Sequence, residues 1–374
     1  MNILIFLIIL LVLVISHEFG HFFVAKKSGI RVDEFSFGFP PKIFGKKVGE
    51  TSYNFNLLPF GGYVKIYGQG SDDFPGQNGE KVIDEKDPRS FSSKPRYIQA
   101  GVLIAGVVMN FLVAWVLLSV GFMSGLPTSI GSVPAGTEVK DQAITITSVV
   151  SDSPAFESGL KIGDKILSLE TKDDSTKLLS SNFEISSIQS FIKNHEGEEV
   201  KVSLIRGKEP VEIIVIPLKD ESSQNIMIGI SMDIIGTLQL PIHKALWEGL
   251  KLSSDVFIAT VVGFYNLIHD AFLGQADINT LTGPVGIVGV VGDAAKFGFV
   301  YLLSFTALIS INLAVINLLP FPALDGGRLL FLLIEKIKGS KIKPKIANLV
   351  NMIGFGLLMI LMVVITYHDI VKLL

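Results

Sequence analysis

The residues best suited to chemistry lie in the segment "ISHEFGHFF", residues 15–23. It places His17, Glu18 and His21 in a run, Ile3 to Val24, that is otherwise apolar, Gly or Ser. An ionisable group in hydrocarbon costs about 2.5–3.5 kcal/mol on insertion scales, so such groups usually mark function. On a helix, residues 17 and 21 are about 400° and about 6 Å apart, which puts both imidazoles on one face.

This spacing favours a metal ion. Two imidazoles on one helical face can hold one zinc ion, and Glu18 beside them can take a proton from a water at that ion. The H-E-x-x-H pattern also occurs by chance, but three ionisable groups in an apolar helix need partners or a metal. We therefore predict His17 and His21 as ligands, Zn²⁺ as the cofactor and Glu18 as the group that accepts the proton.

The composition of the whole chain is that of a multi-pass membrane protein. Of its 374 residues, 49% are hydrophobic and only 18% are charged, against about 25% charged in soluble proteins. A net charge of −3 without a large basic cluster argues against nucleic acid as a partner. The absence of cysteine excludes disulfides, thiolate ligands and cysteine catalysis. Because the first apolar run lacks a basic n-region and an A-x-A site, we expect a retained helix, not a signal peptide.

Four apolar stretches are long enough to cross a bilayer core about 30 Å thick. We predict four transmembrane helices within residues 1–25, 97–126, 297–337 and 346–368, the third stretch including the LDGG motif. A fifth apolar run, 257–268, has only 12 residues and follows an amphipathic stretch. Segment 240–290 is therefore predicted to lie along the membrane surface.

Lysine and arginine near the span ends predict the orientation. Lys26 and Lys27 follow the first span, Lys94 and Arg96 precede the second, and a lysine-rich run, 336–345, separates the third from the fourth. Both loops are then cytoplasmic, while the two termini and region 124–296 lie outside. His17 is about 24 Å along a helix that enters from outside, so it lies near the cytoplasmic face.

A catalytic zinc usually has three protein ligands and one open position. The four remaining histidines are predicted on the wrong side of the membrane: His195, His243, His269 and His368. The strongest carboxylate candidate is Asp325 in "INLLPFPALDGGRLL", and its alternative role is to cap the helix 326–337. With four spans, Asp325 and the histidines meet at one depth. With five, Asp325 would face the opposite side, so depth favours the ligand role.

The region outside the membrane contains a predicted soluble domain, residues 128–231. "SVVSDSPAFESGLKIGDKILSLE" predicts a strand, a short helix, a turn and a second strand, and a helix with two alternating strands follows. The S-P-A-x-x-S-G-L-x-x-G-D-x-I pattern resembles a PDZ domain of the bacterial extracytoplasmic type. Such domains bind extended peptides by strand addition, which makes a peptide ligand an expected partner. Another small β-rich domain is the alternative.

The cytoplasmic loop 26–96 also shows strand-like alternation. Phe35, Phe37 and Phe39 alternate with small residues, and "SYNFNLLPFGGYVKI" continues the pattern. Aromatic residues on one face beside a membrane favour a sheet that dips into the bilayer surface. An ordinary cytoplasmic sheet remains the alternative.

Together these motifs resemble the bacterial site-2 proteases, most closely the regulator of sigma-E protease type. The resemblance rests on H-E-F-G-H in the first span, N-x-x-P-x-P-x-L-D-G-G after the third, and a PDZ insert between the second and third. It implies that His17, His21 and Asp325 bind zinc, that Glu18 is the catalytic base, and that Asn317 lies near zinc and substrate. A helix–helix hydrogen bond is the alternative role of Asn317.

The resemblance also implies that strands in 35–66 hold the substrate as an added strand. Two departures stand out. The second-span motif reads "AGVVMN", with Val107 where the family often has proline, which puts a kink there in doubt. There is one PDZ domain where the enterobacterial protease has two, so its substrate gating is not carried over.

The expected function is that of a zinc-dependent intramembrane endopeptidase in a bacterial cytoplasmic membrane. Its expected substrates are transmembrane segments of single-pass proteins, such as an anti-sigma factor already trimmed outside or a remnant signal peptide. A membrane zinc transporter is one alternative, against which Glu18 and the lack of an inverted repeat of spans argue. A catalytically inactive PDZ membrane scaffold is another, against which the intact H-E-x-x-H argues.

Overall fold

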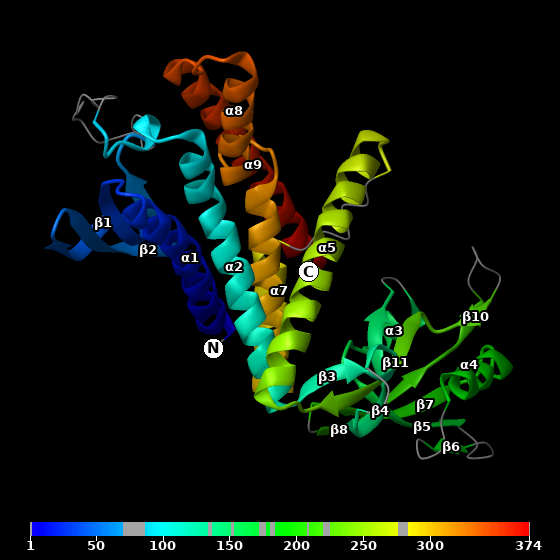
Figure 1. The fold of residues 1–374 in the computed structure, drawn as a ribbon. Coiled ribbons are helices and arrows are strands. Elements are labelled where there is room, and N and C mark those ends of the chain that lie inside the picture. The colour runs from blue at the N-terminus through cyan, green and yellow to red at the C-terminus, as the bar shows by residue number, and fades with distance from the viewer. Residues whose placement is uncertain are drawn as a thin grey trace. The chain divides into compact units, whose positions relative to one another are not determined.

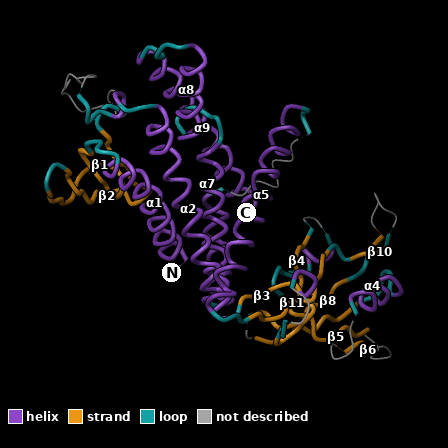
Figure 2. The backbone as a smooth tube through the Cα atoms, viewed as in Figure 1, coloured by secondary structure: helices purple, strands orange, loops and turns teal. Residues whose placement is uncertain are grey.

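The computed structural model of the chain describes residues 2–69, 87–133, 137–150, 153–171, 177–179, 184–207, 209–219, 225–275 and 283–373. The chain forms two compact units. The first comprises Met1–Ser119, Leu246–Gly292 and Leu303–Leu374, and the second comprises Val120–Ala245 and Asp293–Leu302. Long helices dominate the first unit and a sheet dominates the second (Figures 1 and 2).

Five helices in the described part of the chain are long and apolar enough to cross a membrane. They are α1 (Asn2–Lys27), α2 (Arg96–Ser124), α5 (Ile242–Phe272), α7 (Phe299–Leu318) and α9 (Pro344–Leu373). Four of them coincide with the predicted spans, and α5 is the additional one. α2 is continuous through Val107, as expected where valine keeps the backbone N–H that proline would lack.

Helix α5 differs from the surface segment that the sequence led us to expect. The indole of Trp115 donates a 2.8 Å hydrogen bond to the carbonyl of Leu246, and further along α5 the ring of Phe257 meets that of Phe111 edge to face. Later residues of α5 thus contact earlier residues of α2, so the two helices run antiparallel. The prediction that 240–290 lies flat on the membrane does not fit these contacts, because α5 follows the apolar length of α2.

These contacts do not make α5 a fifth span. Its first half carries Glu248, Lys251 and Asp255, and the uncharged stretch from Val256 to Ile268 spans only about 20 Å at 1.5 Å per residue. A bilayer core of about 30 Å would then contain at least one charged residue, Asp255 or Asp270. The four-span topology therefore remains our prediction, with α5 entering the membrane beside α2. Helix α6 (Pro284–Phe297) precedes α7 in the chain.

A turn of two prolines ends α7 and starts α8 (Asp325–Lys338). Pro320 and Pro322 cannot continue a helix because each lacks a backbone N–H. A Cβ on Gly326 would collide with the carbonyls of Leu318 and Leu319, so only glycine lets α8 begin this close to α7. The turn thus returns Asp325 to the end of α7.

The loop between α1 and α2 contains two long strands, β1 (Val32–Val48) and β2 (Thr51–Ile66), followed by the short helix η1 (Phe91–Ser93). Residues 34–37 of β1 pair with 62–65 of β2 and also with 52–55, while 42–48 pair with 51–56. The strands predicted in 35–66 are confirmed. Val32, Phe35 and Ile66 are buried in a core with apolar residues of α1 and α2.

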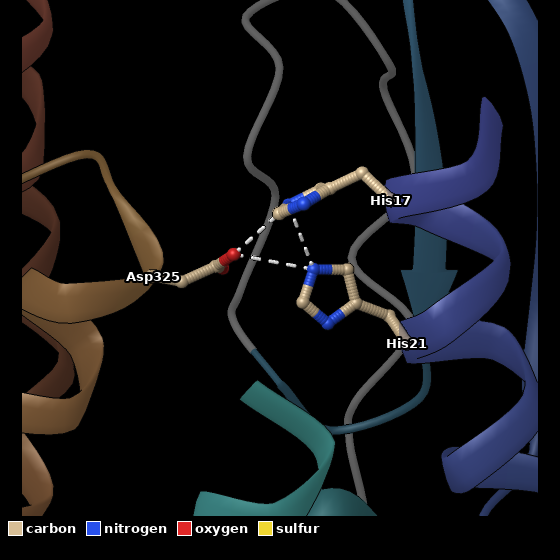
Figure 3. A group of neighbouring side chains, drawn as sticks. All are labelled: His17, His21 and Asp325. Carbon is tan, nitrogen blue, oxygen red and sulfur yellow. Dashed lines mark hydrogen bonds and ion pairs between the residues drawn. The ribbon is translucent and has the colours of Figure 1, made fainter. Parts of the chain in front are cut away.

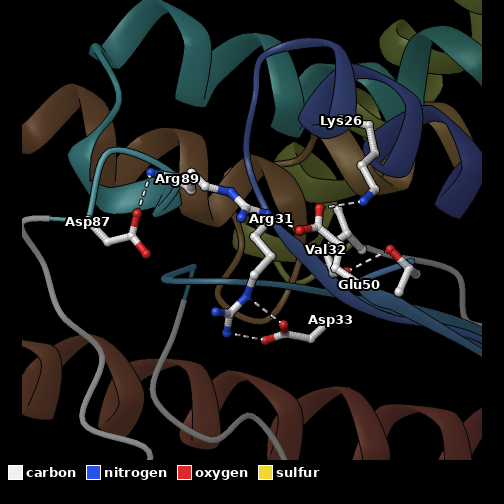
Figure 4. Close-up of polar contacts among 8 residues, drawn as sticks. Lys26, Arg31, Val32, Asp33, Glu50, Asp87 and Arg89 are labelled. Carbon is white, nitrogen blue, oxygen red and sulfur yellow. Dashed lines mark hydrogen bonds and ion pairs between the residues drawn. The ribbon is translucent and has the colours of Figure 1, made fainter. Parts of the chain in front are cut away.

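Polar contacts attach this sheet to the end of α1 (Figure 4). Lys26, in the last turn of α1, donates a 2.7 Å hydrogen bond to Glu50 in the β1–β2 turn, and Arg89 pairs with the same carboxylate. The hydrogen bond from Lys26, together with Arg89, lowers the pKa of Glu50. Thr51 donates a 2.8 Å hydrogen bond to the carbonyl of Val32. The sheet is therefore anchored one turn beyond the H-E-x-x-H segment.

The second unit contains the inserted domain, residues 126–238, whose sheet has the strand order β3-β11-β4-β5-β7-β8, with β6 pairing β5. These strands are β3 (Leu126–Ser129), β4 (Lys140–Val149), β5 (Lys165–Thr171), β6 (Lys177–Leu179), β7 (Val200–Arg206), β8 (Glu209–Val215) and β11 (Ile230–Leu238). A separate pair, β9 (Leu218–Lys219) and β10 (Ile226–Met227), and three helical segments, η2 (Ile130–Ser132), α3 (Pro154–Glu157) and α4 (Ile185–Asn194), complete it.

The strands and helices predicted between Val149 and Val215 are confirmed. The predicted range 128–231, however, would cut through β11, which pairs with both β3 and β4. The core contains Ile146, Leu169 and Ile188. The buried Asp164 carboxylate accepts two hydrogen bonds, of 2.8 and 2.7 Å, from the Arg206 guanidinium and is thereby neutralised.

Candidate metal centre

Three side chains from distant parts of the sequence converge at one point (Figure 3). The Nε2 atoms of His17 and His21 are 3.1 Å apart, and they lie 3.1 and 3.2 Å from Oδ2 of Asp325. A tetrahedral zinc ion with bonds of about 2.0–2.1 Å separates its ligand atoms by about 3.3–3.4 Å. Two neutral imidazoles and one carboxylate are also the donor types that zinc takes, so the residues fit this ion in both geometry and chemistry.

Asp325 reaches the histidines because of the turn after α7. It is the first residue of α8, and the cap position before it is Leu324, whose side chain makes no capping hydrogen bond. The alternative in which Asp325 caps α8 is therefore wrong. Its side chain is 14% exposed and points at the two imidazoles.

Helix α2 supports the imidazoles from behind. The carbonyl of Val102 lies 2.8 Å from Nδ1 of His21, and Nδ2 of Asn110 lies 3.4 Å from Nδ1 of His17. Between them, a Cβ on Gly106 would lie 2.5 Å from Nε2 of His21 and 2.6 Å from Cε1 of His17. Only a residue without a side chain leaves room for both rings here.

None of these three α2 residues was assigned to the metal centre from the sequence, although the "AGVVMN" motif contains two of them. The available signal was their spacing. Positions 102, 106 and 110 are four residues apart, so they lie along one face of α2. That face presents a backbone carbonyl, a gap and a side-chain amide in an otherwise apolar span.

Close packing of α1 on α2 makes these contacts possible. A Cβ on Gly20 would collide with the carbonyl of Ala105. Because Gly20 has none, the backbones approach closely beside the ligand pair, as small residues permit between membrane helices. His17 and His21 are consequently only 8% and 7% exposed.

Glu18 lies between the metal group and the edge of the sheet. It is half-buried, and the backbone of Val64 in β2 hydrogen-bonds to its carboxylate. A Cβ on Gly62 would lie 3.8 Å from Cγ of Glu18, an ordinary contact distance, so this strand residue lies directly against the Glu18 side chain. The carboxylate is thus next to both the three converging atoms and strand residues 61–66.

The other predicted residues lie elsewhere. Asn317 is half-buried in the last turn of α7, and it is not among the three residues whose ligand atoms converge. His195 is in the inserted domain, where Nδ1 donates a 2.7 Å hydrogen bond to the carbonyl of Phe191. His269 is an exposed neighbour of Asp270 on α5.

Known proteins resemble this chain over most of its length. The model of Peptidase family M50 matches residues 5–361. The regulator of sigma-W protease RasP of Bacillus subtilis is 32% identical, with 98% of each chain aligned. A Clostridium perfringens protein provisionally named a zinc metalloprotease is 37% identical over 96% of this chain and 95% of its own. The zinc metalloprotease RasP of Shouchella clausii is 30% identical, with 98% of each chain aligned.

Proposed function

The chain belongs to peptidase family M50, the site-2 type of zinc metalloprotease, and from this premise we propose that His17, His21 and Asp325 hold its zinc ion and that Glu18 is its catalytic base. The observation that carries the proposal is the convergence of the three ligand atoms within 3.2 Å of one another. Family membership favours proteolysis over the transporter and scaffold alternatives.

Each proposed residue has a defined task. When bound, zinc supplies Lewis-acid chemistry that makes water a nucleophile near neutral pH. Glu18 takes the proton that this water loses as its oxygen attacks the peptide carbonyl carbon. When the C–N bond breaks, Glu18 delivers the proton to the departing amine, so one carboxylate serves as base and then as acid. Its place beside the ligand atoms allows both transfers without a further proton carrier.

The substrate we propose is a transmembrane segment of a single-pass protein, held in extended form along residues 61–66 of β2. Peptide bonds in a helix are shielded by their hydrogen bonds, so the segment must unwind before attack. The strand closest to Glu18 offers backbone groups to which an extended chain can pair. Apolar side chains on the same sheet are exposed, including Ile43, Phe44 and Leu57. They favour a sheet that dips into the bilayer surface over an ordinary cytoplasmic sheet.

The biological setting we propose is a bacterial cytoplasmic membrane with the inserted domain on the extracytoplasmic side. An anti-sigma factor already trimmed outside, or a remnant signal peptide, fits a site reached through the membrane. One relative is named a regulator of sigma-W protease, which favours the first of these. The inserted domain, as a PDZ domain, would bind peptide and exclude bulky substrates.

The direct test is cleavage of tagged candidate transmembrane segments by wild-type protein and by Glu18→Gln in parallel, in vesicles. Glutamine keeps size and helix, so zinc content should be unchanged while cleavage falls below detection. Glu198→Gln, an exposed change in the inserted domain, is the matched control and should cleave normally. Substantial cleavage by Glu18→Gln would refute its role as base.

A further inference from the structure

The hydrogen-bond partner of His21 defines which of its nitrogens carries the proton. Nδ1 lies 2.8 Å from the carbonyl of Val102, and a carbonyl oxygen can only accept. Nδ1 is therefore protonated, and the lone pair of Nε2 points to Asp325 and to the neighbouring imidazole. His21 is held in the form that binds a metal.

His17 must be in the same form if its Nε2 is to be a ligand, because a neutral imidazole has one lone pair. Its Nδ1 would then carry a proton directed at the side chain of Asn110, 3.4 Å away. The amide atom that faces it is Nδ2, which is itself a donor, and two donors make no hydrogen bond. Oδ1 of Asn110 is meanwhile buried without a hydrogen-bond partner among the described residues.

One rotation resolves both problems. The two ends of an amide have nearly the same shape, so their assignment must follow from the surrounding hydrogen bonds. Turning the Asn110 amide by about 180° places Oδ1 against Nδ1 of His17, where it accepts that proton. Both the unpaired buried oxygen and the clash between donors are then removed.

We propose that Asn110 is a positioning residue of the zinc centre, whose Oδ1 accepts the Nδ1–H of His17 and so holds Nε2 towards the metal. The inference rests on the zinc site proposed above. Val102 and Asn110 would then orient the two imidazoles from one face of α2, one through a backbone carbonyl and the other through a side-chain amide.

The surroundings of Asn110 hold it in place for this role. Asn110 is 0% exposed, and its backbone carbonyl accepts a 2.8 Å hydrogen bond from the hydroxyl of Ser310 in α7. Asn110 therefore contacts α1 through its side chain and α7 through its backbone. Ser310 provides a control, because its removal loosens the contact between α2 and α7 without touching His17.

The test measures zinc affinity by competition with a chromophoric chelator, with Glu18→Gln as the parent so that turnover does not interfere. Asn110→Leu keeps the approximate shape but removes the acceptor, and it should bind zinc about 10–100-fold more weakly, as expected for loss of such a partner. Asn110→Asp keeps an acceptor and cannot donate, so its affinity should stay within about threefold of the parent or rise. Ser310→Ala should also stay within about threefold.

Two results would overturn the inference. One is a folded Asn110→Leu variant with the affinity of the parent. The other is an Asn110→Asp variant that loses affinity tenfold or more, since that outcome would show that Asn110 acts as a donor. The second comparison decides the question even where the leucine variant does not fold. If the parent itself binds no zinc, the proposed site fails instead, so the two failures are distinguishable.

Discussion

Replacing Gly106 by alanine should weaken zinc binding without disturbing α2. The added Cβ would lie 2.5 Å from Nε2 of His21 and 2.6 Å from Cε1 of His17. Non-bonded heavy atoms need about 3.5–4.0 Å, so one or both rings must retreat by about 1 Å. Separation of the helices is resisted by the close contact of Gly20 with Ala105.

The size of the effect follows from this overlap. Metal–ligand distances hold to within about 0.2 Å, so a displacement of about 1 Å cannot be absorbed with both rings still bound. Overpacking of this kind typically costs about 1–3 kcal/mol. At about 1.4 kcal/mol for each factor of ten, zinc affinity should fall by about 5–150-fold.

The assay is chelator competition on purified protein, with Gly101→Ala as the matched control. Gly101 is on the same helix, but a Cβ there meets nothing within 4 Å. The control should keep full zinc affinity and gain slightly in helix stability, because alanine favours helix over glycine by about 1 kcal/mol. If Gly106→Ala binds zinc as tightly as Gly101→Ala, the argument that α2 shapes the site is wrong.

Four further predictions concern Asp325, the membrane topology, the inserted domain and Glu50. Asp325→Asn should lose bound zinc as well as activity, because a neutral amide is a poor zinc ligand; normal zinc by metal analysis would remove Asp325 from the ligand set. In a chain that has no native cysteine, single cysteines at the exposed positions Ser190 and Ser340 should be labelled from outside and from inside respectively. Labelling of both positions from the same side would contradict the four-span topology. Joining Thr128 to Gly236 through a flexible linker keeps the paired stem of β3 and β11 and should leave the zinc centre assembled and a short substrate cleaved. An untrimmed, bulky substrate should then be cleaved faster; loss of cleavage of the short one, with zinc retained, would show that the domain is needed for the active conformation. Glu50→Gln should lower the unfolding temperature near neutral pH, and the difference should vanish at low pH. The lowered pKa of Glu50 means that its contribution is complete above its unfolded pKa and is lost as pH falls through the folded value; a difference that persists in acid would contradict this.

The convergence of His17, His21 and Asp325 could be predicted because the chemistry of these residues conflicts with their surroundings. His17, Glu18 and His21 are conspicuous in an apolar run, and Asp325 follows a span that descends to the same depth. The supporting face of α2 was harder to find, since a carbonyl and a glycine carry no chemical signature in a sequence. Asn110 was visible in the motif, but its partner depends on how α1 packs against α2.

The fold, like the site, was predicted from the sequence only in part. Alternation and turn residues correctly predicted strands in the 35–66 loop and between Val149 and Val215. They did not predict that β11 joins β3 and β4, because pairing between segments about 100 residues apart is a tertiary choice. Helix α5 was predicted from its short apolar run and the amphipathic stretch before it, neither of which shows that it packs along α2.

X-ray absorption at the zinc edge of the purified, zinc-loaded protein tests the central claim most directly. The account predicts one zinc per chain, with two imidazole nitrogens and oxygen ligands at about 2.0–2.2 Å. Loss of one imidazole from the spectrum in each of His17→Ala and His21→Ala would assign the two nitrogens. A shell of oxygens alone, or a spectrum that neither histidine variant alters, would contradict a zinc centre built on the H-E-x-x-H helix.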